Sequence, residues 1–171
     1  MKFITIPPRI ADAIILVCIL CTMASCGGNS RSKLPPGVTA KKEPLSFEEA
    51  KKDWRNNRGI GPIREDVVLG VIDTEMVKAG QGLFAINCTA CHEPYKDKIG
   101  PALVGVTERR RPEWIMNMML NPEEMVKTDP ICLGLLAKYN AVMANQRLKP
   151  EQSRKILEFL RSLKLEDKAN L

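Results

Sequence analysis

The stretch Cys88-Thr89-Ala90-Cys91-His92 decides how this chain folds. His92 is the only histidine among the 171 residues. On a helix, Cys88, Cys91 and His92 would occupy positions i, i+3 and i+4, which share one face. The spacing therefore predicts two thiols and one imidazole side by side.

A C-x-x-C-H run is the attachment signature of c-type haem. The two thiols of such a run form thioethers with the haem vinyl groups, and the imidazole reaches the iron from the same side. Because the chain has no second histidine, two imidazoles cannot bind the iron. The other axial position is left to methionine, to another weak ligand or to no side chain.

Two other interpretations of the run remain open. A structural zinc site needs four ligands, and Cys132 could complete a set of three sulfurs and one nitrogen with the run. A redox dithiol would need the strand–helix alternation of a thioredoxin-like fold, which the sequence does not show.

The start of the chain predicts export across a membrane. Lys2 and Arg9 give a positive region, and residues 13–23 form an apolar stretch that is short for a membrane span. The four residues ending at Cys26, Met-Ala-Ser-Cys, resemble the lipobox of bacterial lipoproteins, although leucine is more usual in place of the methionine. Residues 1–25 would then be a signal peptide, and acylated Cys26 would anchor the protein on the periplasmic side of a bacterial membrane. An ordinary secreted protein and an uncleaved anchor are the alternatives.

These assignments account for five of the six cysteines. Cys18 and Cys21 leave with the signal peptide, Cys26 carries lipid, and two cysteines carry haem. Cys132 remains as a lone thiol, so we expect no internal disulfide. Cys132 is interpreted as a small apolar residue of the core or the surface.

Residues 26–45 are rich in Gly, Ser, Pro and charge, and are interpreted as a flexible tether. Residues 46–72 form an N-terminal extension. Ser46 and Glu49 make a capping box that predicts a short helix to about Asn57. The compact domain is expected to span residues 73–171.

Apolar spacing predicts four helices in this domain. They cover residues 74–87 with Thr74 as the cap, residues 112–120 ended by Asn121-Pro122, residues 131–139 and residues 150–165. No alternation typical of a half-buried sheet appears, so the fold class is all-α. Only 5% of the residues are aromatic, and a buried haem would supply apolar volume that so small a core lacks.

Residues 74–165 resemble a class I cytochrome c. Gly80 and Phe84 precede Cys88 by eight and four residues, and Gly100-Pro101-Ala102-Leu103 matches the loop after the haem site. The resemblance implies N-terminal and C-terminal helices that cross beside a covalently bound haem c. Gly80 would allow close approach of the crossing helix, and Phe84 would pack near Phe159 or Leu160.

The resemblance also implies the surroundings of the iron. The Pro101 carbonyl would accept a hydrogen bond from His92, which fixes the ring and raises its basicity. Met143, in a loop before the last helix, would be the sixth ligand, although Ala144 stands where many relatives have proline. Met125 is the alternative ligand, in what is expected to be a loop. The other methionines are assigned to packing or to the signal peptide, or lie on the wrong side of the motif.

Three further residues are expected near the haem. Trp114 and Arg110 would donate hydrogen bonds to a haem carboxylate. The alternative is a core tryptophan beside a solvated basic run. Tyr139 would lie on the sulfur side of the haem.

A haem with histidine and methionine ligands has no open site, so the resemblance implies a one-electron carrier and not an enzyme. The expected partners are a respiratory oxidase or reductase and a quinol-side donor. The alternative function is a haem enzyme or sensor with an open or labile sixth site. The net charge is +6, of which residues 1–25 hold +1, and basic residues could steer the domain to an acidic partner. Nucleic acid is not expected as a partner, because the protein is exported.

Overall fold

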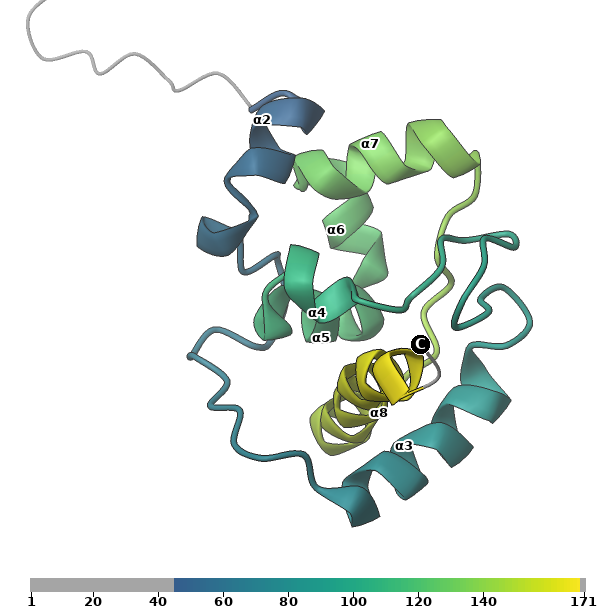
Figure 1. Cartoon of the computed structure of the whole chain (residues 1–171). Coiled ribbons are helices and arrows are strands. Elements are labelled where there is room, and N and C mark those ends of the chain that lie inside the picture. Colours follow the sequence, from purple (N-terminus) through teal and green to yellow (C-terminus); the bar gives the residue numbers. More distant parts are fainter. Residues whose placement is uncertain (1–44, 170–171) are drawn as a thin grey trace, which may run out of the picture. The chain divides into compact units, whose positions relative to one another are not determined.

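The structure is a computed structural model in which residues 45–169 are described, and their regular secondary structure is entirely helical (Figure 1). This confirms the predicted all-α class. The elements are α2 (Phe47–Lys52), the 3-10 helix η1 (Trp54–Asn56), α3 (Thr74–Asn87), α4 (Val106–Arg109), α5 (Pro112–Leu120), α6 (Pro122–Thr128), α7 (Pro130–Tyr139) and α8 (Pro150–Ala169).

Helices α3 and α8 cross at close range, as the resemblance to class I cytochrome c implies (Figure 1). A Cβ added to Gly80 would lie 2.0 Å from the Lys155 carbonyl oxygen, so only glycine fits at this crossing. One turn later, the rings of Phe84 and Phe159 lie 5.2 Å apart at an interplanar angle of 50°. The crossing therefore joins the helix that leads into the Cys88–His92 run to the last helix of the described chain.

The apolar stripe of α8 forms the centre of the core. Helices α4 and α5 pack against α8 as well, and α5 contributes apolar side chains to the same cluster. The buried apolar residues that α5 and α8 bring together are Trp114, Ile115, Met116, Met119, Ile156, Leu157, Phe159, Leu160 and Leu163.

Proline opens four of the helices, which moves the predicted start of α7 from residue 131 to Pro130 and reveals one helix that was not predicted. Pro112, Pro122, Pro130 and Pro150 are the first residues of α5, α6, α7 and α8, where the missing N–H costs no hydrogen bond. The Asn121-Pro122 pair ends α5 as predicted, but it also starts α6, which the sequence analysis missed. The four-residue helix α4 was missed too.

A second correction concerns the start of α3. Its N-cap is Asp73 and not Thr74. The Asp73 side chain accepts hydrogen bonds from the backbone N–H groups of Glu75 and Met76. At α2, by contrast, the predicted capping box of Ser46 and Glu49 is present in full.

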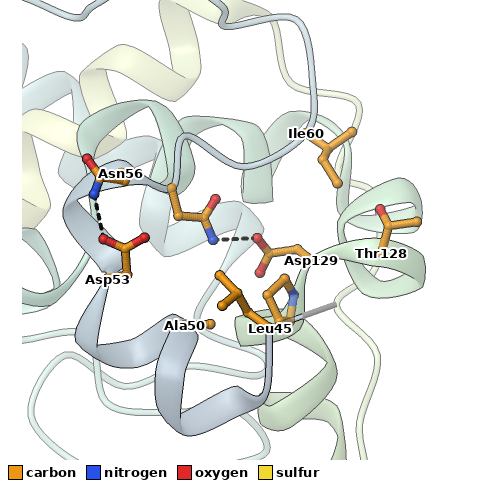
Figure 2. A pocket seen from close by; sticks show the side chains of 9 residues that line it. Leu45, Ala50, Asp53, Asn56, Ile60, Thr128 and Asp129 are labelled. Atoms are coloured by element: carbon orange, nitrogen blue, oxygen red, sulfur yellow. Dashed lines mark hydrogen bonds between the residues drawn. The ribbon is translucent and has the colours of Figure 1, made fainter. Parts of the chain in front are cut away.

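The N-terminal part of the extension, helix α2, packs against α7. A Cβ on Gly134 of α7 would lie 2.0 Å from the Phe47 ring, so α2 approaches α7 closely at this point. Further along, the Asn57 side-chain amide donates a 2.7 Å hydrogen bond to Asp129, which caps α7. A small pocket remains between the two segments, with Ala50 and Asp53 on the side of the extension and Asp129 on the other (Figure 2).

Buried polar side chains fasten the rest of the extension to α5 and α8. The Asn117 amide group of α5 donates to the carbonyls of Arg58 and Ile63, and accepts from the Ile63 N–H, at 2.9–3.0 Å. Glu113 accepts from the Val67 N–H at 2.6 Å. Glu158 of α8 accepts from the Asp73 N–H at 3.1 Å. Residues 46–72 are thus bonded along their length to the helices that follow.

The predicted signal peptide (residues 1–25), the predicted lipid site Cys26 and all but the last residue of the predicted tether lie outside the described residues. Within residues 45–169, no helix is both long and apolar enough to cross a membrane.

Candidate functional site

One large cavity brings the predicted site residues of the described chain together. Its volume, including the part open to solvent, is about 1430 Å³. The predicted site residues that line it are Cys88, Cys91, His92, Pro101, Arg110, Trp114, Tyr139 and Met143.

His92 is held by the turn that follows α3 and by the loop opposite. Helix α3 ends at Asn87, but the His92 N–H still donates to the Cys88 carbonyl at 2.8 Å, so the run forms one helix-like turn. The imidazole Nδ1 lies 3.0 Å from the Pro101 carbonyl oxygen, as expected from the resemblance. A Cβ on Gly100 would lie 2.4 Å from the imidazole Cε1. Glycine at this position thus lets the loop reach the ring.

Cys88 and Cys91 both line the cavity. Cys88 is partly buried and Cys91 is exposed. Burial, helped by the neighbouring Cys91, raises the pKa of the Cys88 thiol to about 11. Redox-active dithiols have a lowered thiol pKa, so this environment does not favour the redox dithiol interpretation.

The zinc interpretation is not supported either. Within residues 45–169, no three or more His, Cys, Asp or Glu side chains are grouped so that they could hold a metal ion. Cys132 therefore does not complete a Cys3His site with the run. It lies on another wall of the cavity, with its sulfur 3.3 Å from the Met118 sulfur.

Trp114 and Arg110 form a polar corner in an otherwise largely apolar cavity. The indole Nε1 of Trp114 is buried and has no hydrogen-bond partner among the described residues. The Arg110 guanidinium lies 5.2 Å from the centroid of that ring. Burial, with a smaller effect of the Arg109 charge, lowers the pKa of Arg110. An unpaired donor beside a buried cation fits a carboxylate acceptor, such as a haem propionate.

Met143 lines the cavity from residues 140–149, which have no regular secondary structure. Met125, the alternative ligand, is in a different place. It belongs to α6 and not to a loop, it is fully buried, and it is absent from the cavity wall. Its sulfur instead lies 2.9 Å from the Ile60 backbone nitrogen in the extension.

Tyr139 lines the cavity, but its hydroxyl group already has partners. It donates to Asp97 at 2.8 Å and accepts from Lys138 at 3.0 Å. Tyr139 therefore contributes a ring to the cavity wall, while its polar end joins two segments of the chain.

Sequence reasoning missed three residues of α7 in the wall, which are Cys132, Leu135 and Leu136. They line the cavity together with the predicted Tyr139, and the four have the i, i+3, i+4 and i+7 spacing of one helix face. This spacing could have identified the face of α7 that borders the haem site. Arg109 was missed as well; it donates to the carbonyls of Ala102 and Val104 and supports the loop beside Pro101.

The fold and the cavity together define a small helical haem protein of the c type. A family model for cytochrome c matches residues 77–164, more than half of the chain, and the chain belongs to this family. Covalently bound haem c is therefore its cofactor, and the protein is a haem-based electron carrier. Domains of this family are typically extracellular or periplasmic.

Solved structures of similar proteins agree with this assignment. Cytochrome c from Rhodothermus marinus is 43% identical, with a TM-score of 0.60 over 62% of this chain and 91% of that chain. An engineered form of that cytochrome is 42% identical, with a TM-score of 0.59 over 61% and 91% of the two chains. An engineered form bound to a carbene intermediate, 1-ethoxy-1-oxopropan-2-ylidene, is 43% identical, with a TM-score of 0.57 and the same coverage. Comparison with curated proteins gives no significant match.

Proposed function

We propose that this cytochrome passes single electrons through a haem iron bound by His92 and Met143. The donor would be on the quinol side of a respiratory chain, and the acceptor would be a membrane-associated or periplasmic oxidase or reductase. The observation that carries the proposal is that one cavity is lined by the Cys88–His92 run, the Pro101 loop and Met143. Haem c supplies a one-electron couple, and a methionine ligand raises its potential relative to two histidines.

The side chains of the cavity have distinct tasks in this proposal. The Pro101 carbonyl accepts a hydrogen bond from Nδ1–H of His92, which leaves Nε2 free to bind iron. Trp114 and Arg110 bind a carboxylate at the buried end. The apolar side chains of α5 and α7 exclude water from the iron. Exposed Cys91 lies at the open edge, where a redox partner could approach.

A second function has a specific observation in its favour. Ala144 follows Met143, and both lie in a segment without helix, so a labile methionine would allow a haem enzyme or sensor. The engineered relative that is bound to a carbene intermediate makes this alternative relevant. The two functions differ in one property, which is whether Met143 stays bound to the iron.

Replacement of Met143 by alanine in the holoprotein tests the proposal. We expect a sulfur-to-iron charge-transfer band in the spectrum of the ferric wild type and its loss in Met143→Ala. Ferrous wild type should also be reoxidised by respiratory membranes. Met76→Ala is the matched control, because Met76 lies at the start of α3 and does not line the cavity.

Absence of the band from the wild type, or its persistence in Met143→Ala, would refute methionine ligation by this residue. Ready binding of carbon monoxide by the wild type as prepared would favour the enzyme or sensor. Failure of every terminal acceptor in the membranes to reoxidise the ferrous protein would refute the respiratory role.

A further inference from the structure

The segment that carries Met143 lacks the usual means of rigidity. Residues 140–149 have no regular secondary structure, and Ala144 stands where a proline would restrict the backbone. A sulfur ligand that must stay on the iron in both oxidation states needs a loop with few alternative conformations. Other contacts must therefore restrict this loop.

The start of the loop is tied to the opposite side of the cavity. Tyr139, the last residue of α7, donates its hydroxyl proton to Asp97 Oδ2 at 2.8 Å. The two residues are 42 positions apart in sequence. Asp97 lies in the loop after the haem-binding run, so this hydrogen bond joins the histidine side of the site to the segment that leads to Met143.

The same carboxylate also fixes the loop around the histidine. Asp97 Oδ1 accepts from the Ala102 N–H at 2.8 Å, and Ala102 follows Pro101, whose carbonyl faces His92. Lys138 Nζ lies 3.0 Å from the Tyr139 hydroxyl oxygen and 3.8 Å from Asp97 Oδ2. Asp97 is thus the point at which both sides of the site are fastened.

The backbone after Tyr139 adopts an unfavourable conformation, which the hydrogen bond between Tyr139 and Asp97 helps to maintain. Asn140 has φ 49° and ψ 35°, a left-handed conformation that ends α7. Arg147 has φ 53°, and its backbone N–H donates a 2.9 Å hydrogen bond to the Asn145 side-chain oxygen. Two non-glycine residues with positive φ therefore enclose Met143, and such residues persist only where their surroundings hold them.

We propose that Tyr139 and Asp97 are positioning residues for the sixth ligand, and that their hydrogen bond keeps Met143 on the haem iron. The inference rests on the proposed ligation by Met143 and adds the contact that maintains it. Without this bond, α7 still forms, but the turn at Asn140 loses its attachment to the histidine side. The fraction of molecules with a displaced methionine then rises.

The fraction of molecules in which Met143 has left the iron can be measured with an external ligand. Imidazole binds ferric iron only when Met143 has left, so its apparent affinity is proportional to the fraction of open molecules. Loss of one hydrogen bond of ordinary strength changes such a fraction by about three- to tenfold. We therefore expect Tyr139→Phe to raise the apparent affinity of the ferric holoprotein for imidazole by about three- to tenfold.

A double-mutant cycle separates positioning from general stability. Tyr139→Phe should have less than about a twofold effect in an Asp97→Ala background, because the bond is already absent there. Asn121→Ala is the matched control, since Asn121 donates a 3.2 Å hydrogen bond to the extension at Ile60 and does not line the cavity. It should lower the unfolding free energy without changing the affinity for imidazole.

Equal effects of Tyr139→Phe in both backgrounds, or no effect of either Tyr139→Phe or Asp97→Ala, would overturn the inference. If the variants differ from the wild type only in their urea midpoint, the role is merely structural and the inference is wrong. Failure of the proposed ligation is distinguishable, because then the charge-transfer band is missing from the wild type or survives in Met143→Ala.

Discussion

At the scale of single residues, Trp114 gives direct information about the cofactor. A buried N–H without a partner costs about 1–3 kcal/mol, and such groups are rare in folded proteins. The indole N–H lies in the wall of the haem cavity beside the Arg110 guanidinium. Both are donors, so the expected partner is an acceptor, and a haem carboxylate would supply one.

Trp114→Phe keeps the ring and removes this donor. A hydrogen bond to an ionised carboxylate lowers the pKa of that group, so the variant should raise the pKa of the haem propionate by about one unit. The reduction potential of the holoprotein, measured as a function of pH, should then change at a higher pH than in the wild type. Trp54→Phe is the control, because Trp54 belongs to the extension and stacks on Arg55. Identical pH profiles for Trp114→Phe and the wild type would contradict this role.

Single residues also mark the limit of sequence reasoning about the site. The spacing of Cys88, Cys91 and His92 predicted a haem-attachment site without reference to any family. Met143 and Pro101 came only from resemblance, because nothing in their own spacing refers to iron. The hydrogen bond between Tyr139 and Asp97 was beyond prediction, since it joins the end of α7 to a distant loop and no periodicity relates the two.

At the scale of helices, the crossing of α3 and α8 requires a residue without a side chain at position 80. Gly80 faces the backbone of α8, whereas Gly82, two residues on, is exposed and has no atom within 4 Å of an added Cβ. The same helix thus contains one glycine required by packing and one that packing does not require.

Alanine at these two positions should have opposite effects on stability. Gly80→Ala places a methyl group against the Lys155 carbonyl and should lower the unfolding free energy by about 1–3 kcal/mol or more. Gly82→Ala should raise it by about 0.5–1 kcal/mol, because alanine favours an exposed helix. Urea titration of the holoproteins, followed by circular dichroism, measures both changes. Similar values for the two variants would contradict the close crossing.

The long helices were predictable because each has an apolar stripe and a clear boundary. Helix α6 was missed because Asn121-Pro122 was interpreted only as a stop, although proline is also favoured in the first turn of a helix. This error placed Met125 in a loop and made it a candidate ligand. Helix α4 has only four residues, which is too short for a periodic pattern to be recognised.

At the scale of the whole molecule, the extension is part of the folded structure. Asn117, Glu113 and Glu158 are all buried, and each binds backbone groups between Arg58 and Asp73. Sequence patterns could not predict these bonds, because polar residues on a helix are usually assigned to its solvent face. The result is a molecule in which buried carboxylates fasten one segment to the rest.

These carboxylates make stability depend on pH. Burial alone would raise the pKa of Glu158, but hydrogen bonds from Arg154 and Arg161 outweigh it and hold the pKa below its usual value. The pKa of Glu113 is lowered in the same way, with burial again opposed by Arg111. The two carboxylates therefore bind protons more readily in the unfolded state than in the folded state. Their contribution to the unfolding free energy is fully present above about pH 5 and is lost as the pH falls through the folded-state pKa values.

Unfolding free energies measured between pH 3 and pH 7 test this dependence. Each such carboxyl contributes a slope of at most about 1.4 kcal/mol per pH unit in the acid range. Glu158→Gln should therefore be less stable than the wild type at neutral pH and show a shallower acid dependence. Glu151→Gln, an exposed change on the same helix, should leave the slope as it is. An unchanged slope in Glu158→Gln would show that this carboxyl does not contribute.

The single histidine of this chain has a practical consequence. His92 is the only imidazole in the molecule, and its Nδ1 lies against the Pro101 carbonyl. Histidine labelled with ¹⁵N would therefore give resonances from one ring alone, without any background from elsewhere in the polypeptide. With His92 bound to the iron as proposed, changes on that side of the iron, on reduction or on docking to a partner, would alter this pair of nitrogen signals.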